Sequence, residues 1–213
     1  MKYELQDILS GKSQISQGVS LQSIIRYLGV CAEASKISKQ EKHFKKEEAK
    51  SLEKYIVTHN LWFENIDFSQ YVSEGAEQKV YLKDSSHVLK LNDAIYYISW
   101  EDYFHNLLLH NYFFPDTSYE LLGFTKQASV LYAVVKQAFV SSTEQTDLNK
   151  VRTFLEANGF KNIRNNDYYN PELGIILEDL HDENVLTQKG ILFFIDTVFY
   201  LTENFWKNDE RHP

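Results

Sequence analysis

The sequence predicts an α+β protein, with clustered and mostly antiparallel strands that follow an N-terminal helical stretch. Before about residue 65 the apolar residues recur at helical spacing, and after it short runs rich in Val, Tyr and Leu are separated by turn residues. The chain has 213 residues, 43% of them hydrophobic, with 14 Tyr and 14 Phe. We therefore expect one domain, or a domain with an appendage, and a core built largely of aromatic rings.

Helical periodicity dominates the first part of the chain. Residues 20–34 are expected to form a helix with one apolar stripe. The members of that stripe are Leu21, Ile24, Ile25 and Leu28. A second helix is expected to open with a capping box at Ser38 and Glu41. Its Lys- and Glu-rich run KHFKKEEAK is typical of a solvated helix face, and partner binding is the alternative interpretation.

Strand and helix signals follow one another in the middle of the chain. Residues 80–82 and 87–91 flank the turn-like KDSS and predict a hairpin. Ser99, with Asp102 three residues later, predicts the N-cap of a helix. The segments YELLGF and SVLYAVVKQAFV predict two further strands.

The last third of the chain is expected to contain one clear helix and several short strands. TDLNKVRTFLEANGF predicts the helix, with Gly159 at its C-terminal end. GIILEDL, NVLTQ and GILFFIDT predict short extended segments, and residues 199–206 predict a final helical turn or two.

Charge and cysteine content narrow the function classes. A formal net charge of −8 argues against nucleic-acid binding through bulk charge, because phosphates need a basic face. The single cysteine, Cys31, cannot build a disulfide framework or a Cys-based zinc site within the chain, which favours a reducing compartment. The N-terminus lacks the apolar core of a signal peptide, and no run approaches the roughly 18 apolar residues that span a membrane. A cytoplasmic protein without a membrane partner is expected.

Polar residues interrupt the apolar segments at four informative positions. Asp179 and Asn184 form D-x-x-x-x-N in LEDLHDEN, and Asp196 ends the strand-like run ILFFIDT. Upstream, Lys90 lies inside the apolar strand HVLKL, where an ammonium group would lose its hydration. Carboxylates in such surroundings need a cation partner, a metal or a surface position. A surface turn and an outward-facing lysine are therefore the alternative interpretations.

The order of these features resembles the protein-kinase arrangement. A glycine loop lies between two strands, and a strand lysine and a helix with an acid near its start follow; D-x-x-x-x-N and a strand-terminal Asp come last. LEDLHDEN is similar to the HGDLHPGN loop of the aminoglycoside and choline phosphotransferase branch. The matching positions are Asp179, Leu180, His181 and Asn184. Residues 71–198 also resemble the small kinase-like domains in polyvalent proteins of phages and conjugative elements, where a GAEQ-like loop occurs with a DLH-x-x-N loop.

This resemblance implies a protein-kinase-like α+β fold in three parts. Residues 1–64 would form an N-terminal helical extension, residues 65–140 an antiparallel-sheet N-lobe, and residues 141–213 a minimal C-lobe with the catalytic and metal loops. IDT stands where kinases have DFG, so no glycine hinge follows Asp196. The C-lobe is expected to be short because 17 residues follow Asp196 (213 minus 196). We expect it to be minimal, or completed by residues 1–60, by a partner or by a larger polypeptide.

The resemblance further implies a site for ATP and Mg²⁺. Asp179 would act as the base toward the attacking hydroxyl, and Asn184 and Asp196 would hold the metal. The residues implied on the nucleotide side are Lys90, Glu101, Gly75, Val80, Gln137 and Phe139. Lys90 would contact the α- and β-phosphates with Glu101 as its carboxylate partner, Asp102 being the other acid of that helix.

The remaining nucleotide-side residues are implied by the glycine-rich loop and the hinge. SEGAEQKV aligns with G-x-G-x-x-G-x-V so that Gly75 keeps the second glycine and Val80 the valine. Gln137 to Phe139 would present backbone groups to the edge of the adenine.

Three functions remain open on this evidence. The first is a phosphotransferase acting on a hydroxyl group of a protein or small molecule. The second is a pseudokinase or nucleotide-binding module of a mobile-element protein, and the third is an interaction protein that uses its N-terminal helix.

Overall fold

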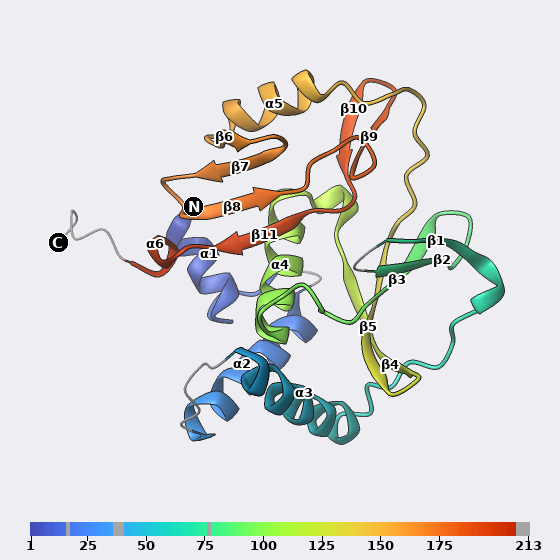
Figure 1. Cartoon of the computed structure of the whole chain (residues 1–213), viewed down its shortest axis with the longest axis vertical. Coiled ribbons are helices and arrows are strands. Elements are labelled where there is room, and N and C mark those ends of the chain that lie inside the picture. The colour runs from blue at the N-terminus through green and yellow to red at the C-terminus, as the bar shows by residue number, and fades with distance from the viewer. Residues whose placement is uncertain (16–17, 36–40, 76–77, 208–213) are drawn as a thin grey trace. The chain divides into compact units, whose positions relative to one another are not determined.

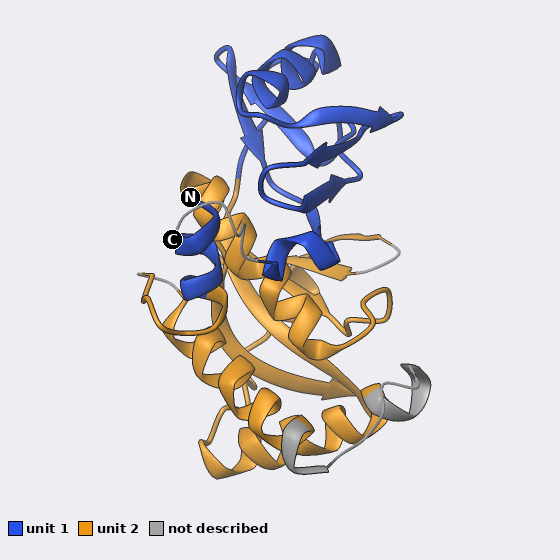
Figure 2. Ribbon diagram, turned by 90° about the vertical axis from the view of Figure 1, so that its left-hand side faces the viewer, with its two compact units in different colours: residues 1–8, 140–213 blue, residues 9–139 orange. Residues whose placement is uncertain are grey.

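A computed structural model describes residues 1–15, 18–35, 41–75 and 78–207 of the chain. It divides into two compact units, residues 9–139 and residues 1–8 with 140–213 (Figure 2). The unit boundary falls after Phe139, the last residue of the predicted hinge.

The 9–139 unit is built around a five-stranded antiparallel sheet of order β1-β2-β3-β5-β4 (Figure 1). Its elements are α2 (Val19–Ser35), α3 (Glu41–Thr58), η1 (Phe68–Gln70), β1 (Tyr71–Glu74), β2 (Gln78–Leu82), β3 (His87–Asn92), α4 (Trp100–Phe113), η2 (Pro115–Thr117), β4 (Glu120–Gln127) and β5 (Val130–Ala138). The predicted hairpin is confirmed as β2 and β3. Ser99 is confirmed as the N-cap of α4, because its hydroxyl accepts the Asp102 N–H at 3.0 Å. The predicted cap at Ser38 lies outside the described residues.

Apolar side chains pack against both faces of the sheet. On one face, Ile66, Tyr81, Leu89, Leu91 and Val134 form a buried cluster. Toward α4, the rings of Trp100 and Phe104 lie 6.4 and 6.2 Å from that of Phe124, which is fully buried in β4. Aromatic rings at these separations pack as edge-to-face pairs, so the expected ring-rich core is confirmed around α4.

The other unit contains two small antiparallel sheets. Its elements are α1 (Lys2–Leu9), α5 (Leu148–Ala157), β6 (Lys161–Arg164), β7 (Asp167–Asn170), β8 (Ile175–Glu178), β9 (Val185–Gln188), β10 (Ile191–Phe194), β11 (Val198–Leu201) and α6 (Glu203–Trp206). The unit includes α1 as far as Ile8. Strands β11-β8-β7-β6 form one sheet and β10-β9 the other. Lys2 and Gln6 donate to the Asn204 and Phe205 carbonyls, at 2.7 and 2.5 Å, so α1 is joined to the α6 segment.

The α+β class with antiparallel sheets is confirmed, and one element prediction is wrong. Residues 198–201 form β11, which pairs with β8, and the helical turn begins only at Glu203. The reason is that Val198 and Phe199 continue the pairing of β8, which supplies hydrogen bonds that an isolated helical turn would lack. Strands β6 and β7 were not predicted.

Candidate catalytic and nucleotide site

Asp179 stands directly after β8, in a backbone conformation that turns the chain sharply. Its φ is +63°, a left-handed value that Asp tolerates better than most residues. The Asp179 N–H donates to the Asp167 carboxylate at 3.1 Å, and the next N–H, of Leu180, donates to the Asn166 carbonyl at 3.3 Å. Leu180 is fully buried whereas the Asp179 side chain is 59% exposed. The buried Leu180 side chain thus anchors the segment, while the neighbouring Asp179 carboxylate stays accessible to solvent.

The loop after Asp179 closes back on it through Asn184. The Asn184 amide nitrogen Nδ2 donates to the Asp179 carbonyl at 2.8 Å and to its carboxylate oxygen Oδ2 at 3.0 Å. The backbone supports this closure, because the His181 carbonyl accepts the N–H groups of Asn184 and Val185, each at 3.0 Å. With Nδ2 turned toward Asp179, the amide oxygen of Asn184 points to the other side.

His181 completes the loop as a hydrogen-bonding residue. Its Nδ1 accepts the Glu183 N–H at 3.3 Å, and its Nε2 lies 3.1 Å from the Asn184 Nδ2. Nε2 lies 3.4 Å from the Asp179 oxygen Oδ1. The ring therefore lies beside both Asn184 and the carboxylate that the resemblance predicts to be the base.

Asp196 is brought to Asn184 by the β9–β10 hairpin. Val185 pairs with Phe194, and the next residues continue the ladder, with the Asn184 carbonyl accepting the N–H of Ile195 at 2.9 Å and of Asp196 at 3.3 Å. The backbones of the two predicted metal ligands are thus adjacent in space although Asp196 lies twelve positions after Asn184 in sequence.

The segment around Asp179 also concentrates negative charge. Burial raises the pKa of Glu178 above its ordinary value, and the neighbouring carboxylates of Asp167 and Asp179 raise it further. Like charges in one place disfavour ionisation, and a bound cation would relieve them. Among the described residues, no three His, Cys, Asp or Glu side chains are grouped to hold a metal ion.

In the 9–139 unit, Lys90 is a buried residue of β3. It is 4% exposed, and its cross-strand neighbours are Val80 on β2 and Val135 on β5, whose side chains share its face of the sheet. Its Nζ lies 5.4 Å over the centre of the Tyr119 ring. The alternative of an outward-facing lysine is therefore wrong, because the strand is covered on the lysine's side.

Glu101 lies at the opposite end of α4 from the groups near Lys90. Its N–H donates to the Glu48 carboxylate at 3.1 Å in the first turn of the helix. Tyr119 contacts His110 in the last turn, and nine residues at about 1.5 Å each place that turn roughly 13 Å along the axis from Glu101. The Lys90–Glu101 pair stays a prediction.

Gly75 lies between β1 and β2, as expected for the predicted loop. Its N–H donates to the Gln78 carbonyl at 2.9 Å, and a Cβ there would meet nothing within 4 Å of the described structure. Ala76 and Glu77, at the tip, lie outside the described residues.

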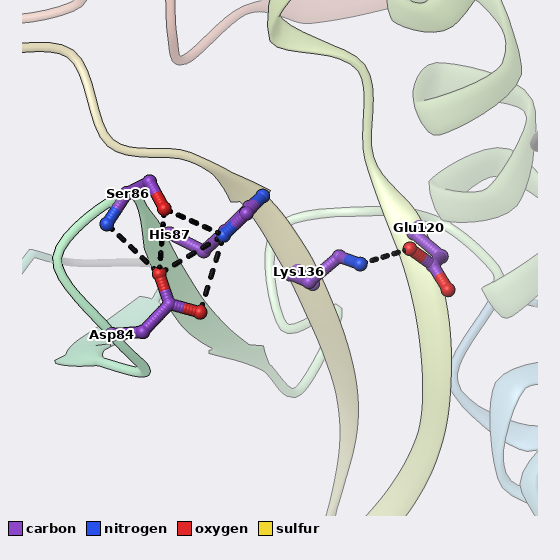
Figure 3. Close-up of polar contacts among 5 residues, drawn as sticks. All are labelled: Asp84, Ser86, His87, Glu120 and Lys136. Atoms are coloured by element: carbon purple, nitrogen blue, oxygen red, sulfur yellow. Dashed lines mark hydrogen bonds and ion pairs between the residues drawn. The ribbon is translucent and has the colours of Figure 1, made fainter.

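The end of β5 is held by the turn between β2 and β3. Asp84 accepts the Ser86 N–H at 2.8 Å and lies 3.0 Å from Nδ1 of His87 (Figure 3). The Ser86 carbonyl in turn accepts the Phe139 N–H at 2.8 Å. The backbone N–H of Phe139 is therefore used within the fold, as is the Gln137 side chain, whose Nε2 donates to the Thr117 carbonyl at 2.7 Å.

Among the predicted hinge residues, Ala138 has its backbone N–H and C=O directed away from β3, because these groups alternate in direction along an antiparallel strand. Because Phe139 bonds across to Ser86, the N–H and C=O of Ala138 point away from β3. On that side β4 begins only at Glu120, which pairs with Lys136 through the ladder and an ion pair (Figure 3). Ala138 thus extends past the neighbouring strand.

Sequence reasoning missed the residues that anchor these groups. Asn166, Asp167, Tyr119 and His110 were not singled out. The available signal was the pair His110–Asn111 after LLL in α4, since buried polar side chains require partners.

A five-stranded antiparallel sheet with a buried strand lysine, together with a closed D-x-x-x-x-N loop and a strand-terminal Asp, defines a kinase-like protein. The family comparison agrees. The chain belongs to the family described as serine/threonine/tyrosine kinases found in polyvalent proteins, whose model matches residues 45–203. The match confirms the resemblance to polyvalent-protein kinases and implies the kinase-like fold. No curated protein and no solved structure matches the chain. No helix in the described part of the chain has the length and apolar character needed to cross a membrane.

Proposed function

We propose that this protein transfers the γ-phosphoryl group of ATP to a hydroxyl group of a protein or small molecule. The hydroxyl oxygen bonds to the γ-phosphorus, the bond from that phosphorus to the bridging oxygen of the β-phosphate breaks, and ADP leaves. The hydroxyl proton passes to Asp179. The observation that carries the proposal is the closed Asp179–Asn184–Asp196 arrangement, in a chain of a kinase family.

The donor set fits Mg²⁺. This ion prefers hard oxygen ligands and takes few of them from protein, the rest coming from phosphates and water. The Asn184 amide oxygen and the Asp196 carboxylate would be its protein ligands, because Nδ2 of Asn184 is held by Asp179. When bound, Mg²⁺ would neutralise phosphate charge. Lys90 is assigned to the α- and β-phosphates.

Adenine recognition is assigned to the backbone at the end of β5. Ala138 has its N–H and C=O on the side that β4 leaves uncovered, whereas the Phe139 N–H is bonded to Ser86. Gln137 and Val80 contribute side-chain packing on the face that carries Lys90.

The alternative is a nucleotide-binding module without phosphoryl transfer. Its support is the departure from DFG, since the buried Thr197 follows Asp196 where kinases have Phe-Gly. A thermal-shift titration with ATP and Mg²⁺ separates the possibilities. A shift without labelled product would favour the module, and no shift would contradict both.

The base assignment is tested by Asp179→Asn. We expect phosphate transfer from labelled ATP, including autophosphorylation, to fall by at least about 100-fold, because general-base catalysis is lost. The thermal shift with ATP and Mg²⁺ should persist. Asp182→Asn is the matched control, since this exposed acid lies in the same loop. Undiminished transfer by Asp179→Asn would contradict the assignment.

A further inference from the structure

A pocket of about 580 Å³ lies within the 9–139 unit, and none of its described lining residues is assigned to ATP or Mg²⁺. It is lined by α3, by the connection between β3 and α4, by the first residue of α4 and by the start of β5. Apolar side chains in its lining include Ala49, Ile95, Ile98, Trp100, Val130 and Leu131. Ligand sites are typically mainly apolar pockets of roughly 300–1,000 Å³, so this pocket has the size of a binding site.

Three large aliphatic side chains at this pocket remain exposed to solvent. Ile95 and Ile98 are 62% and 60% exposed, and Val130 is 41% exposed. Single exposed apolar residues are common on protein surfaces, whereas several gathered at one pocket mark a site of interaction. These side chains leave water only if a partner covers the rim of the pocket as well as its interior.

The connection between β3 and α4 is held in place by hydrogen bonds. The Asn92 side chain accepts the Ala94 N–H at 2.7 Å, and the Ala94 carbonyl accepts the Tyr97 N–H at 3.0 Å. From α3, the Lys45 ammonium donates to the Ala94 carbonyl and to the Tyr97 carbonyl, the latter at 2.8 Å. The apolar side chains of the connection are therefore presented on a fixed backbone, which lowers the entropy cost of binding a partner.

The charged residues in the lining are Lys45, Lys46 and Asp93. The Asp93 carboxylate accepts the Ile95 N–H at 3.0 Å, whereas the exposed Lys46 side chain forms no hydrogen bond or ion pair with any described residue. Burial lowers the pKa of Lys45, although nearby carboxylates, that of Asp93 first, raise it, so a further anion would stabilise its charged form. In a chain of formal net charge −8, two lysines at an apolar pocket favour a partner whose own charge is negative.

We propose that this pocket docks an acidic peptide segment of a partner protein. Apolar side chains of the segment pack among Ile95, Ile98 and Val130, and one of its carboxylates lies at Lys46. A small molecule inside the pocket leaves the isoleucines of the rim in water, whereas a peptide covers the rim and the pocket together. The cationic side of this surface comes from the Lys- and Glu-rich α3, for which the sequence left partner binding open. The proposal does not depend on phosphoryl transfer.

Short random peptides displayed on phage, and selected on the immobilised full chain, are the probe for this surface. We expect the enriched peptides to combine Asp or Glu with large apolar residues. A synthetic copy of the most enriched peptide should change the fluorescence of Trp100, which lines the pocket, in a background with Trp62→Phe and Trp206→Phe. This signal locates the peptide at the pocket and also measures its affinity.

Two single substitutions test the apolar and the charged part of the surface. Ile98→Ser should weaken binding of that peptide about tenfold, because an apolar contact is lost. Lys46→Glu should weaken it about fivefold, because the charge is reversed. The matched controls are Ile191→Ser, at the same 60% exposure on β10, and Lys54→Glu, an exposed residue about two turns further along α3. Neither control should change the affinity, and all four variants should unfold in urea as the wild type does, since the replaced side chains are exposed.

Each alternative result overturns the proposal. It fails if no peptide is enriched, if the enriched peptides are basic, or if either Ile98→Ser or Lys46→Glu binds the peptide as tightly as the wild type. It also fails if the wild-type chain self-associates in sedimentation and Ile98→Ser abolishes the association, because the occupant is then a second copy. If anilinonaphthalene sulfonate, a small aromatic anion, binds near Trp100 while no peptide does, the pocket takes a small ligand instead.

Discussion

Glu48 of α3 offers the sharpest test of how this fold is held together. Its carboxylate is buried, at 7% exposure, and accepts the N–H groups of Trp100 and Glu101 at 2.6 and 3.1 Å. Both donors belong to the first turn of α4, where the helix backbone supplies no acceptor, so a side chain from another helix caps α4. Burial raises the pKa of Glu48 to about 7, although the two hydrogen bonds lower it, and the carboxylates of Glu101 and Asp102 add to the rise.

The size of the effect follows from that pKa. Raising the pKa from an ordinary 4.5 to about 7 corresponds to about 3 kcal/mol of differential stability. The direction of the pH dependence of stability follows from the raised pKa, because the folded state favours the protonated form of Glu48. The stabilisation from proton binding is complete below pH 4.5 and is lost as pH rises through about 7, because the folded state must then hold a buried charge.

The perturbation is Glu48→Gln, which keeps the shape of the side chain and removes its titration. Urea unfolding would follow Trp100 fluorescence in a background with Trp62→Phe and Trp206→Phe. We expect the free energy of unfolding of wild type minus Glu48→Gln to fall by about 3 kcal/mol from below pH 4.5 to above pH 7.

Glu53→Gln is the control for this experiment. The Glu53 carboxylate stays partly hydrated on α3, where it forms an ion pair with Lys126 at 2.8 Å, so it lacks the burial cost of Glu48. A pH-independent difference between wild type and Glu48→Gln would refute the reasoning, because it would mean that Glu48 is charged in the fold at no cost.

Two further substitutions probe single positions of the fold. Gly174→Ala should cost more than about 2 kcal/mol in urea unfolding, since φ is +72° and a Cβ would lie 2.6 Å from the Phe205 nitrogen. Gly190→Ala, with φ +78° and nothing within 4 Å, should cost only about 1–2 kcal/mol, and equal costs would contradict the steric argument. Asp84 should titrate in carbon-13 NMR near pH 2, because the Ser86 N–H and the His87 ring hold its charged form, whereas titration near 3.8 would disprove these bonds in solution. Its contribution to stability should be present above pH 3.8 and lost as pH falls through about 2.

The sequence predicted elements that are specified by local signals. The Ser99 cap and the hairpin around KDSS need only neighbouring residues, and both appear in the structure. Strands β6 and β7 were missed because KNIR and DYYN are short and polar, and their pairing depends on β8. A strand whose hydrogen bonds come from a distant segment leaves little trace in its own composition.

In the candidate site, too, the residues specified by local sequence could be predicted, whereas those that depend on distant segments could not. Asp179, Asn184 and Asp196 could be named from their order, since they lie in one loop and one hairpin. Tyr119 could not, because its relation to Lys90 depends on how α4 and β4 approach β3. A tyrosine in a strand-like run is typical of any aromatic core, and only the structure shows that its ring lies near a buried ammonium group.

The β9–β10 hairpin explains how Asn184 and Asp196 come together at a spacing of twelve residues. Strands β9 and β10 have four paired residues each, and the two-residue turn Lys189–Gly190 has φ values of +52° and +78°, as a tight hairpin turn needs. This register pairs Asn184 with Ile195 and puts Asp196 next in line, whatever apolar residues fill the strands. A one-residue deletion in β10 would shift the register and turn its side chains to the other face. The position of the predicted metal-ligand pair therefore depends on the register of the hairpin, and the apolar side chains keep that register by fixing which face is buried.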